Sequence, residues 1–274
     1  GPLDPPGSTF KLVVAAAALE SGNFTPDSTF PNPAELQLPE STFRISNADS
    51  GTCGPGSTAT IATAIRLSCN IPFAQLGDAL GSNAIREQAN KFGFNESVSV
   101  PLNSTESVYP RALDRPQTML SAFGQSSVRA SPLQMAMVSM AIANSGTIMQ
   151  PNLVESIVSS DLTTIESFEP TLFNQAISPQ TAAALTQMMV DGVNNGAANT
   201  AAIDGVQVAG KTGTAENGEG EPYTLWFTGF APANDPEVVV AVVVQDGGGL
   251  GQSGTSSGLS APIGRQVLEA VLNR

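Results

Sequence analysis

The feature that most constrains this chain is a long apolar segment close to its N-terminus. Residues 8–19 read STFKLVVAAAAL and carry a single charge, on Lys11. The preceding residues 5–7 are two prolines and a glycine, which cannot continue a helix, so the sequence predicts a helix that starts at or just before Ser8. A helix that is apolar on all sides is a buried helix. We therefore expect Lys11 to lie in dry surroundings.

The polar side chains at the start of this segment are placed to react with each other. Ser8 and Lys11 are three residues apart, so on a helix they share a face with Cβ atoms about 5–6 Å apart. An alcohol one helical turn from an amine, away from water, is a candidate nucleophile with a candidate base. A serine that caps the helix beside an ordinary lysine is the alternative that this segment alone leaves open.

The residue types that the chain lacks narrow the chemistry further. It contains no histidine and two cysteines, which excludes a Ser-His-Asp triad, a Cys-His pair, a histidine-ligated metal and a four-thiolate metal site. A serine nucleophile would therefore need a lysine or a carboxylate as its base. The net charge of −13 argues against nucleic acid as a partner. No run of about 18 apolar residues is present, so no membrane span is expected.

Residues 8–204 read as a mainly helical lobe. After the N-terminal helix, periodic apolar residues with proline and glycine breaks predict helices over residues 57–70, 73–80, 83–92, 131–144 and 178–194. Residues 21–50 and 98–115 are rich in turn-forming residues and read as irregular segments.

Residues 205–274 read as a sheet lobe. Three strands are predicted over residues 206–215, 223–230 and 238–245, and their short connections make neighbouring strands antiparallel. The third strand is apolar throughout, which favours cover on both faces, and an amphipathic helix follows over residues 259–272. Residues 247–258, rich in glycine and serine, are expected to form a mobile loop. A phosphate-cradling loop is the alternative there, but the spacing fits no Walker or dinucleotide pattern.

Two short motifs elsewhere also carry reactive side chains. Ser68-Cys69-Asn70 stands at the end of a predicted helix, and Lys211-Thr212-Gly213-Thr214 stands in the first predicted strand of the sheet lobe. A lysine in an otherwise apolar strand, followed by a glycine that lets another chain approach closely, indicates a site. Each motif is a weak signal when it is taken alone.

Taken together and in this order, the three motifs resemble the S-x-x-K, S-x-N and K-T-G set of penicillin-binding proteins and serine β-lactamases. Further stretches resemble the class B, monofunctional D,D-transpeptidases: residues 124–125, 131–136, 143–146, 225–232 and 260–262. The resemblance covers essentially the whole chain. It implies an α/β (α+β) fold of the penicillin-binding transpeptidase and serine β-lactamase type, with an antiparallel sheet flanked by helices and an all-helical lobe.

The resemblance implies that Ser8 attacks a D-Ala-D-Ala stem peptide, releases D-alanine and forms an acyl-enzyme. An amine from a second stem then completes a peptidoglycan cross-link, and penicillins stall the enzyme as acyl-enzymes. The resemblance implies that Lys11 is the base, that Ser68 relays a proton and that Asn70 holds the substrate amide. It implies that Lys211 supplies positive potential and that Thr212, Gly213 and Thr214 lie around the substrate carboxylate. The backbone N–H groups of Ser8 and Thr214 would form the oxyanion hole. No cofactor or metal is implied.

The same resemblance implies a place and partners for the chain. We expect residues 1–274 to be a transpeptidase domain that lacks its N-terminal elements, on the extracytoplasmic face of a bacterial membrane and anchored by a segment absent from this chain. Because a strand of the family's sheet precedes the nucleophile, an unpaired sheet edge is expected. The implied partners are peptidoglycan stem peptides, β-lactams and division proteins that meet the absent N-terminal region, in cell-wall synthesis during division or the maintenance of cell shape.

The two cysteines enclose fifteen residues, and Cys69 lies between two candidate catalytic residues. In an oxidising compartment a Cys53–Cys69 disulfide would add about 3 kcal/mol of stability on the loop-entropy model. We favour this bond, and two unpaired thiols are the alternative.

Three other activities share parts of the pattern. A β-lactamase commonly has Asp where Cys69 stands, and no acidic loop is placed to activate a deacylating water. A D,D-carboxypeptidase uses the same motifs with water as the acceptor. A penicillin-sensing receptor domain, the non-enzymatic alternative, is acylated without turnover. The stretches typical of class B proteins argue against the carboxypeptidase, which product analysis would separate, and the helix at Ser131 and the Trp226 motif argue against the receptor domain.

Overall fold

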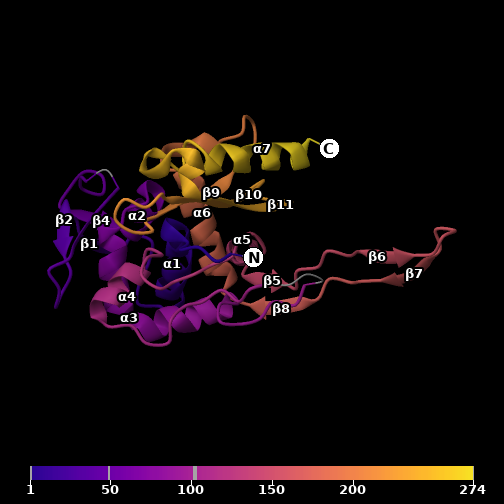
Figure 1. Ribbon diagram of the computed structural model, residues 1–274, viewed down its shortest axis with the longest axis horizontal. Helices are drawn as coiled ribbons and strands as arrows, with labels where there is room; N and C mark the ends of the chain where they lie inside the picture. The colour runs from indigo at the N-terminus through magenta and orange to yellow at the C-terminus, as the bar shows by residue number, and fades with distance from the viewer. Residues whose placement is uncertain (1, 49, 101–103, 274) are drawn as a thin grey trace.

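The computed structural model of the chain describes residues 2–48, 50–100 and 104–273. Figure 1 shows a small sheet with helices on both sides and a long two-stranded arm that extends away from the body. In the described residues the α-helices are α1 (Lys11–Glu20), α2 (Ile61–Leu67), α3 (Ile71–Lys91), α4 (Arg115–Ser121), α5 (Pro132–Ala143), α6 (Pro179–Asn195) and α7 (Ser260–Leu272). This mixed architecture, with an antiparallel sheet flanked by helices, is the one that the sequence predicts.

Helix α1 runs through the centre of the molecule. All residues from 11 to 18 are buried, including the lysine at its start. The α-helix begins at Lys11 rather than at Ser8, because residues Gly7–Phe10 form a tighter 3₁₀ turn, η1. The Ser8 side chain does not cap the helix. The hydroxyl of Ser8 is therefore available to partners outside the backbone of this turn.

The central sheet has the strand order β11-β10-β9, with β9 (Ala209–Ala215), β10 (Thr224–Ala231) and β11 (Val238–Val244) all antiparallel, as predicted. Helix α7 packs on one face of β10 and β11, and α5 packs on the other face (Figure 1). Both faces of β11 are thus covered, yet most of its residues remain partly exposed because β11 lies at the edge of the sheet within the described residues.

The helical part departs from the sequence prediction at three places. The segment from residue 57 begins with strand β4 (Thr58–Thr60), and α2 starts only after Thr60, whose side chain accepts a hydrogen bond from Thr63 N. The helices expected over 73–80 and 83–92 form the single element α3, which bends at Gly81. Helix α4 was not expected, although Asp114 and Gln117 form a capping box that signals its start. Of the expected loop 98–115, residues 101–103 lie outside the described residues.

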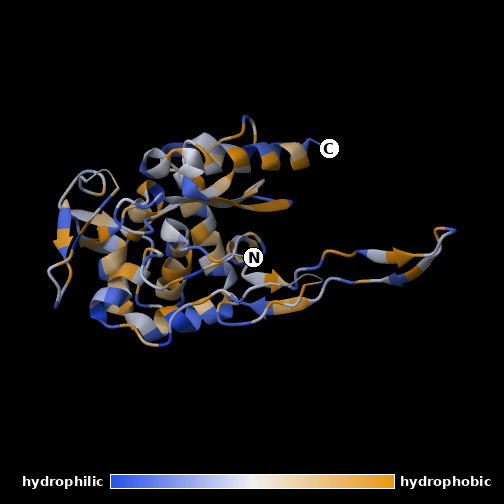
Figure 2. Cartoon of the chain, viewed as in Figure 1, coloured by the Kyte–Doolittle hydropathy of each residue, from blue (hydrophilic) through white to orange (hydrophobic). Residues whose placement is uncertain are grey.

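The remaining strands form two-stranded pairs. These are β1 (Thr29–Pro31) with β4, β2 (Glu35–Gln37) with β3 (Arg44–Ser46), β5 (Thr147–Met149) with β8 (Leu172–Gln175), and β6 (Ser156–Val158) with β7 (Thr164–Ser167). The β6–β7 pair forms the protruding arm, and Figure 2 shows apolar residues along it. Every residue of both strands is exposed. Three short 3₁₀ turns complete the described chain: η2 (Asn199–Ala201), η3 (Asp246–Gly249) and η4 (Gly251–Ser253). None of the helices in the described ranges has the length and apolar character needed to cross a membrane.

Candidate active site

The turn that carries Ser8 lies directly against the backbone of β9. A Cβ atom on Gly7 would come 2.5 Å from the carbonyl oxygen of Thr214, and a Cβ on Gly213 would come 2.9 Å from the carbonyl oxygen of Pro6. Both contacts are possible only for glycine, and Gly7 also adopts a φ of +52°. These two close approaches place Ser8 beside the Lys211–Thr214 motif, although more than 200 residues separate them in sequence.

Two further contacts hold the turn from the other side. Gly7 N donates to the carbonyl oxygen of Gly124 at 3.1 Å, and a Cβ on Gly124 would come 2.0 Å from the carbonyl oxygen of Gly7. The indole Nε1 of Trp226, in β10, donates to the carbonyl oxygen of Pro5 at 2.9 Å. The nucleophile candidate therefore stands on a backbone segment that is fixed by the sheet and by the loop after α4.

The amine of Lys11 is fully buried and makes three hydrogen bonds. Its Nζ lies 2.8 Å from Ser8 Oγ, 2.7 Å from the carbonyl oxygen of Ser68 and 2.9 Å from Asn70 Oδ1. Of these three acceptors, only the Ser8 hydroxyl carries a proton that it could give back. A neutral Lys11 can thus keep its two bonds to Ser68 and Asn70 as a donor and accept the proton of Ser8 as a base.

Both lysines of the motifs lie in the interior, where a charge is poorly solvated. Burial, and next to it the charge of Lys211, lowers the pKa of Lys11 well below its ordinary value. Burial lowers the pKa of Lys211 from 10.5 to about 7. Among the described residues no carboxylate pairs with either amine. The site therefore favours a state in which the two lysines hold one proton fewer than two free lysines would.

The Ser68-Cys69-Asn70 motif joins α2 to α3 and forms what we call the helical wall of the site. Ser68 ends α2 in the left-handed conformation, with φ 62°, and Lys211 Nζ donates to its hydroxyl at 2.6 Å. The hydroxyl of Ser68 thus contacts Lys211, whereas its carbonyl oxygen contacts Lys11. Asn70 Nδ2 donates to the carbonyl oxygen of Ser46 at 3.0 Å, which turns Asn70 Oδ1 toward Lys11.

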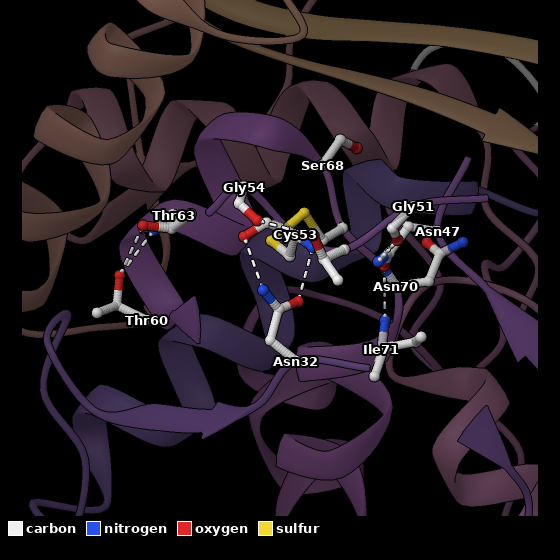
Figure 3. Close-up of a disulfide and its surroundings, with 12 residues drawn as sticks. Asn32, Asn47, Gly51, Cys53, Gly54, Thr60, Thr63, Ser68, Asn70 and Ile71 are labelled. Carbon is white, nitrogen blue, oxygen red and sulfur yellow. Dashed lines mark hydrogen bonds between the residues drawn. A yellow bond between two sulfur atoms is a disulfide. The ribbon is translucent and has the colours of Figure 1, made fainter. Parts of the chain in front are cut away.

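A layer behind the helical wall holds it in place (Figure 3). Cys53 and Cys69 form a disulfide with an S–S distance of 2.11 Å. Asn47 is buried, and its Oδ1 accepts from the backbone N–H groups of Asn70 at 2.8 Å and Ile71 at 3.1 Å. Asn32 makes reciprocal hydrogen bonds with the backbone of Cys53. The motif is therefore fixed by individual side chains and a covalent bond.

The residues Lys211, Thr212, Gly213 and Thr214 on β9 form what we call the sheet wall. Lys211 Nζ also donates to the carbonyl oxygen of Thr212 at 2.8 Å. The hydroxyl of Thr212 donates to the carbonyl oxygen of Ala197 at 3.5 Å, outside the hydrogen-bonded set around Ser8. The hydroxyl of Thr214 pairs instead with Ser256 Oγ at 2.7 Å.

The structure therefore brings Ser8, Lys11, Ser68, Asn70 and Lys211 together, with Lys11 bonded to Ser8, Asn70 and the Ser68 carbonyl oxygen and Lys211 bonded to the Ser68 hydroxyl. Three contributors escaped the sequence reasoning: Gly124, Asn47 and Ser256. Gly124 stood in a stretch that already carried the family resemblance, whereas Asn47 and Ser256 lie in irregular segments where no periodicity marks them. In the described part of the chain, no group of three or more Cys, Asp or Glu residues is arranged to hold a metal ion.

Comparison with known proteins adds a second line of support. Residues 4–269 match the family described as "Penicillin binding protein transpeptidase domain". Peptidoglycan D,D-transpeptidase PbpA of Mycolicibacterium smegmatis is 41% identical over 272 residues, which are 98% of this chain and 55% of that protein. The PbpA of Mycobacterium tuberculosis is 40% identical with the same coverage. The chain thus spans about half the length of the curated relatives that it matches.

Solved structures give the same picture. The ceftriaxone acyl-enzyme complex of penicillin-binding protein A from M. tuberculosis superposes with a TM-score of 0.94 at 38% identity, covering 98% of this chain and 61% of that one. The D,D-transpeptidase domain of a peptidoglycan glycosyltransferase from Eggerthella lenta superposes with a TM-score of 0.90 at 36% identity, covering all of this chain and 66% of that one.

Proposed function

The chain belongs to the penicillin-binding protein transpeptidase domain family, and on that premise we propose that it is the catalytic domain of a class B D,D-transpeptidase of the penicillin-binding protein A group, with Ser8 as its nucleophile. One observation carries the proposal. Within the described residues, the hydrogen-bonding partner of Ser8 Oγ that could act as a base is a fully buried lysine 2.8 Å away, in a chain without histidine.

The acylation step follows from this contact. Lys11, as the neutral amine, takes the proton of Ser8 while Ser8 Oγ attacks the carbonyl carbon of the penultimate D-alanine. The negative charge that develops on the carbonyl oxygen is met by the backbone N–H groups of Ser8 and Thr214, and each donor of this kind contributes about 2.7–4 kcal/mol. Collapse of the intermediate then breaks the peptide bond. The departing amine receives the proton that Lys11 took from Ser8, and D-alanine leaves.

The helical wall and Lys211 have separate parts in this step. Ser68 Oγ accepts from Lys211, so the Ser68 proton is free to point toward the departing amine. Asn70 keeps Lys11 in position and presents its amide to the substrate. Protonated Lys211 supplies the positive potential that attracts the terminal carboxylate of the stem peptide. Thr212 and Gly213 stay in the proposal as parts of the strand against which the substrate lies.

The second half-reaction regenerates the enzyme. The amine of a neighbouring stem peptide attacks the acyl carbonyl and loses a proton to Lys11. The bond between the acyl carbon and Ser8 Oγ then breaks, and Ser8 Oγ takes that proton from Lys11. The product is a cross-link between two stems. A β-lactam would acylate Ser8 by the same first step and leave no amine that diffuses away, so the acyl-enzyme would persist.

The relatives named above are called peptidoglycan D,D-transpeptidases, and one was captured as a ceftriaxone acyl-enzyme. We propose the same substrate class and the same inhibitor class for this chain, at work outside the cytoplasm. A membrane anchor and contacts with division proteins belong to the proposal as well, through parts of the protein outside these 274 residues.

The experiment that tests the proposal is intact-protein mass spectrometry after incubation with benzylpenicillin. We expect one penicillin adduct on the wild type and none on Ser8→Ala. Ser21→Ala removes an exposed hydroxyl at the far end of α1 and should keep the adduct. An adduct on Ser8→Ala would overturn the assignment of the nucleophile. Rapid loss of the adduct would identify a β-lactamase, and release of D-alanine without cross-linked dimers would identify a D,D-carboxypeptidase. A stable adduct without activity on stem peptides would identify a receptor domain.

A further inference from the structure

Ser256 is a buried hydroxyl that the mechanism above does not use. It lies in the segment 245–259 between β11 and α7, the glycine-rich stretch that the sequence predicts to be a mobile loop. The stretch contains the turns η3 and η4, and Ser256 is only 6% exposed. Its Oγ lies 2.7 Å from Thr214 Oγ1 on the sheet wall.

The position of Ser256 is set by the start of helix α7. Its carbonyl oxygen accepts from Ala261 N at 2.9 Å and from Ser260 Oγ at 3.1 Å. The carbonyl oxygen of the next residue, Ser257, accepts from Thr200 Oγ1 at 2.6 Å. The backbone of Ser256 is therefore anchored by the start of helix α7, although the segment around it is irregular.

The Ser256–Thr214 pair stands next to the nucleophile and to an unpaired cation. The carbonyl oxygen of Thr214 lies against Gly7, the residue before Ser8. Lys211 is on the same strand and pairs with no carboxylate in the described residues. An ammonium without an anion, beside hydroxyl donors, is an arrangement that attracts a carboxylate.

The chemistry of two hydroxyls explains why a pair binds an anion better than one. Each hydroxyl has one proton, so one of the two donates to the other and the second keeps its proton free. The free donor is polarised by the bond within the pair, which strengthens the hydrogen bond that it gives to a charged acceptor. Lys211 supplies attraction over distance, whereas the hydroxyl pair supplies direction.

We propose that Ser256 is a specificity-determining residue, which forms with Thr214 a hydroxyl pair that binds the terminal carboxylate of the stem peptide and the carboxylate of a β-lactam. The inference rests on the proposed function and deepens it, because it assigns the recognition of one substrate group to a residue outside the three motifs. Ser256 acts on the carboxylate and takes no part in the proton transfer between Ser8 and Lys11.

The test compares a β-lactam acid with its neutral ester. Second-order rate constants of acylation are measured with benzylpenicillin and with benzylpenicillin methyl ester, on the wild type, Ser256→Ala, Ser256→Thr and the neighbouring control Ser257→Ala. We expect Ser256→Ala to lose about tenfold or more with the acid, the low end for a hydrogen bond to a charged group, and to change little with the ester. Ser256→Thr keeps a hydroxyl and should recover the preference for the acid, and Ser257→Ala should match the wild type.

Equal losses with the acid and the ester would assign Ser256 a structural role and overturn the inference, as would an unchanged rate with both. Thermal unfolding of each variant shows whether Ser256→Ala has destabilised the segment. If it has, the inference is judged on Ser256→Thr alone, by the ratio of its acylation rate constants with the acid and the ester. Absence of any adduct on the wild type would overturn the proposed function together with the inference, whereas an adduct with an unaltered ratio overturns the inference and leaves the function standing.

Discussion

The two walls of the site place polar side chains beside Ser8 by different means. The sheet wall, Lys211–Thr214, belongs to a strand whose backbone pairs with β10 along seven residues. The helical wall, Ser68–Asn70, has no such ladder. It is held by the Asn47 side chain, by the disulfide and by one residue in the left-handed conformation. A wall held by backbone pairing should tolerate the loss of a supporting side chain, whereas a wall held by side chains should not.

The largest expected effect removes the group on which both walls act. Lys11→Met replaces the lysine by an unbranched apolar side chain one atom shorter and removes the proposed base, so acylation by benzylpenicillin should fall by about 10²–10⁴-fold. Because a buried amine is costly to desolvate, the variant should unfold at the same temperature as the wild type or a higher one. Stopped-flow acylation and calorimetry measure the two effects. Acylation within tenfold of the wild type would mean that another group takes the proton of Ser8.

The next effect is the response to pH, which separates the two lysines. Burial lowers the pKa of both amines, so acylation by the acid should rise with pH while Lys11 loses its proton and should fall as Lys211 becomes neutral above its pKa of about 7. The falling limb should be absent with the methyl ester, since an ester has no charge to attract. A falling limb that is the same for the acid and the ester would contradict the role given to Lys211.

The same shifts fix the pH dependence of stability. Both amines have a lower pKa in the folded state than the 10.5 of the unfolded chain, so between about pH 7 and 10.5 the unfolded state binds more protons. The free energy of unfolding should therefore increase with pH across this window. Chemical denaturation of the wild type and of Lys211→Met at pH 7 and pH 9 measures it, and the increase should be smaller in the variant. A slope of the opposite sign would mean that the amines are stabilised in their charged forms.

A smaller effect compares the supports of the two walls. Asn47→Ala leaves the N–H groups of Asn70 and Ile71 without their acceptor, at a cost of about 1–3 kcal/mol in the free energy of unfolding, and should also slow acylation severalfold. The matched control is Thr228→Val in β10, which removes a buried hydroxyl bonded to Ser139 and the Val240 carbonyl. It should cost similar stability and leave acylation unchanged. Equal slowing in the two variants would contradict the distinction between the walls.

The smallest expected effect on rate concerns the disulfide. The double variant Cys53→Ala/Cys69→Ala should lose about 3 kcal/mol of stability on the loop-entropy model. Because Asn47 still holds Asn70, acylation at 25 °C should fall less than in Asn47→Ala. Urea unfolding and acylation rates measure both quantities. A greater rate loss than in Asn47→Ala would make the covalent bond the main support of the helical wall.

The sheet wall was predictable from the sequence and the helical wall was only partly so, for the same physical reason. Strands β9, β10 and β11 are predicted by mainly apolar segments between turns. The position of Lys211 in a buried strand therefore follows from the local sequence pattern. Ser8 and Lys11 are close in sequence, and their spacing fixes their neighbourhood. Asn47 acts on residues 23 and 24 positions away, a distance at which no local pattern gives a signal.

Local signals also failed where neighbouring segments decided the outcome. The helical segment starts at Gly7, just before Ser8 as expected, but its first turn is 3₁₀ and Gly7 lies against Gly124 and Thr214. Gly81 was expected to separate two helices, but its backbone at φ 78° bends a single element. The segment 247–258 carries no periodicity, so the burial of Ser256 beside Thr214 of β9 depends on a contact between residues 42 positions apart.

The close backbone contacts around Gly7 limit which substitutions this molecule can accept. Gly124, Gly7 and the Thr214 carbonyl touch with no space for a methyl group, so any larger residue there would displace the reacting alcohol. If Ser256 and Thr214 bind the β-lactam carboxylate as proposed, changes that alter antibiotic recognition while the chemistry survives should fall in the turn region before α7. Screens for β-lactam resistance should yield substitutions in that region and none at Gly7 or Gly124.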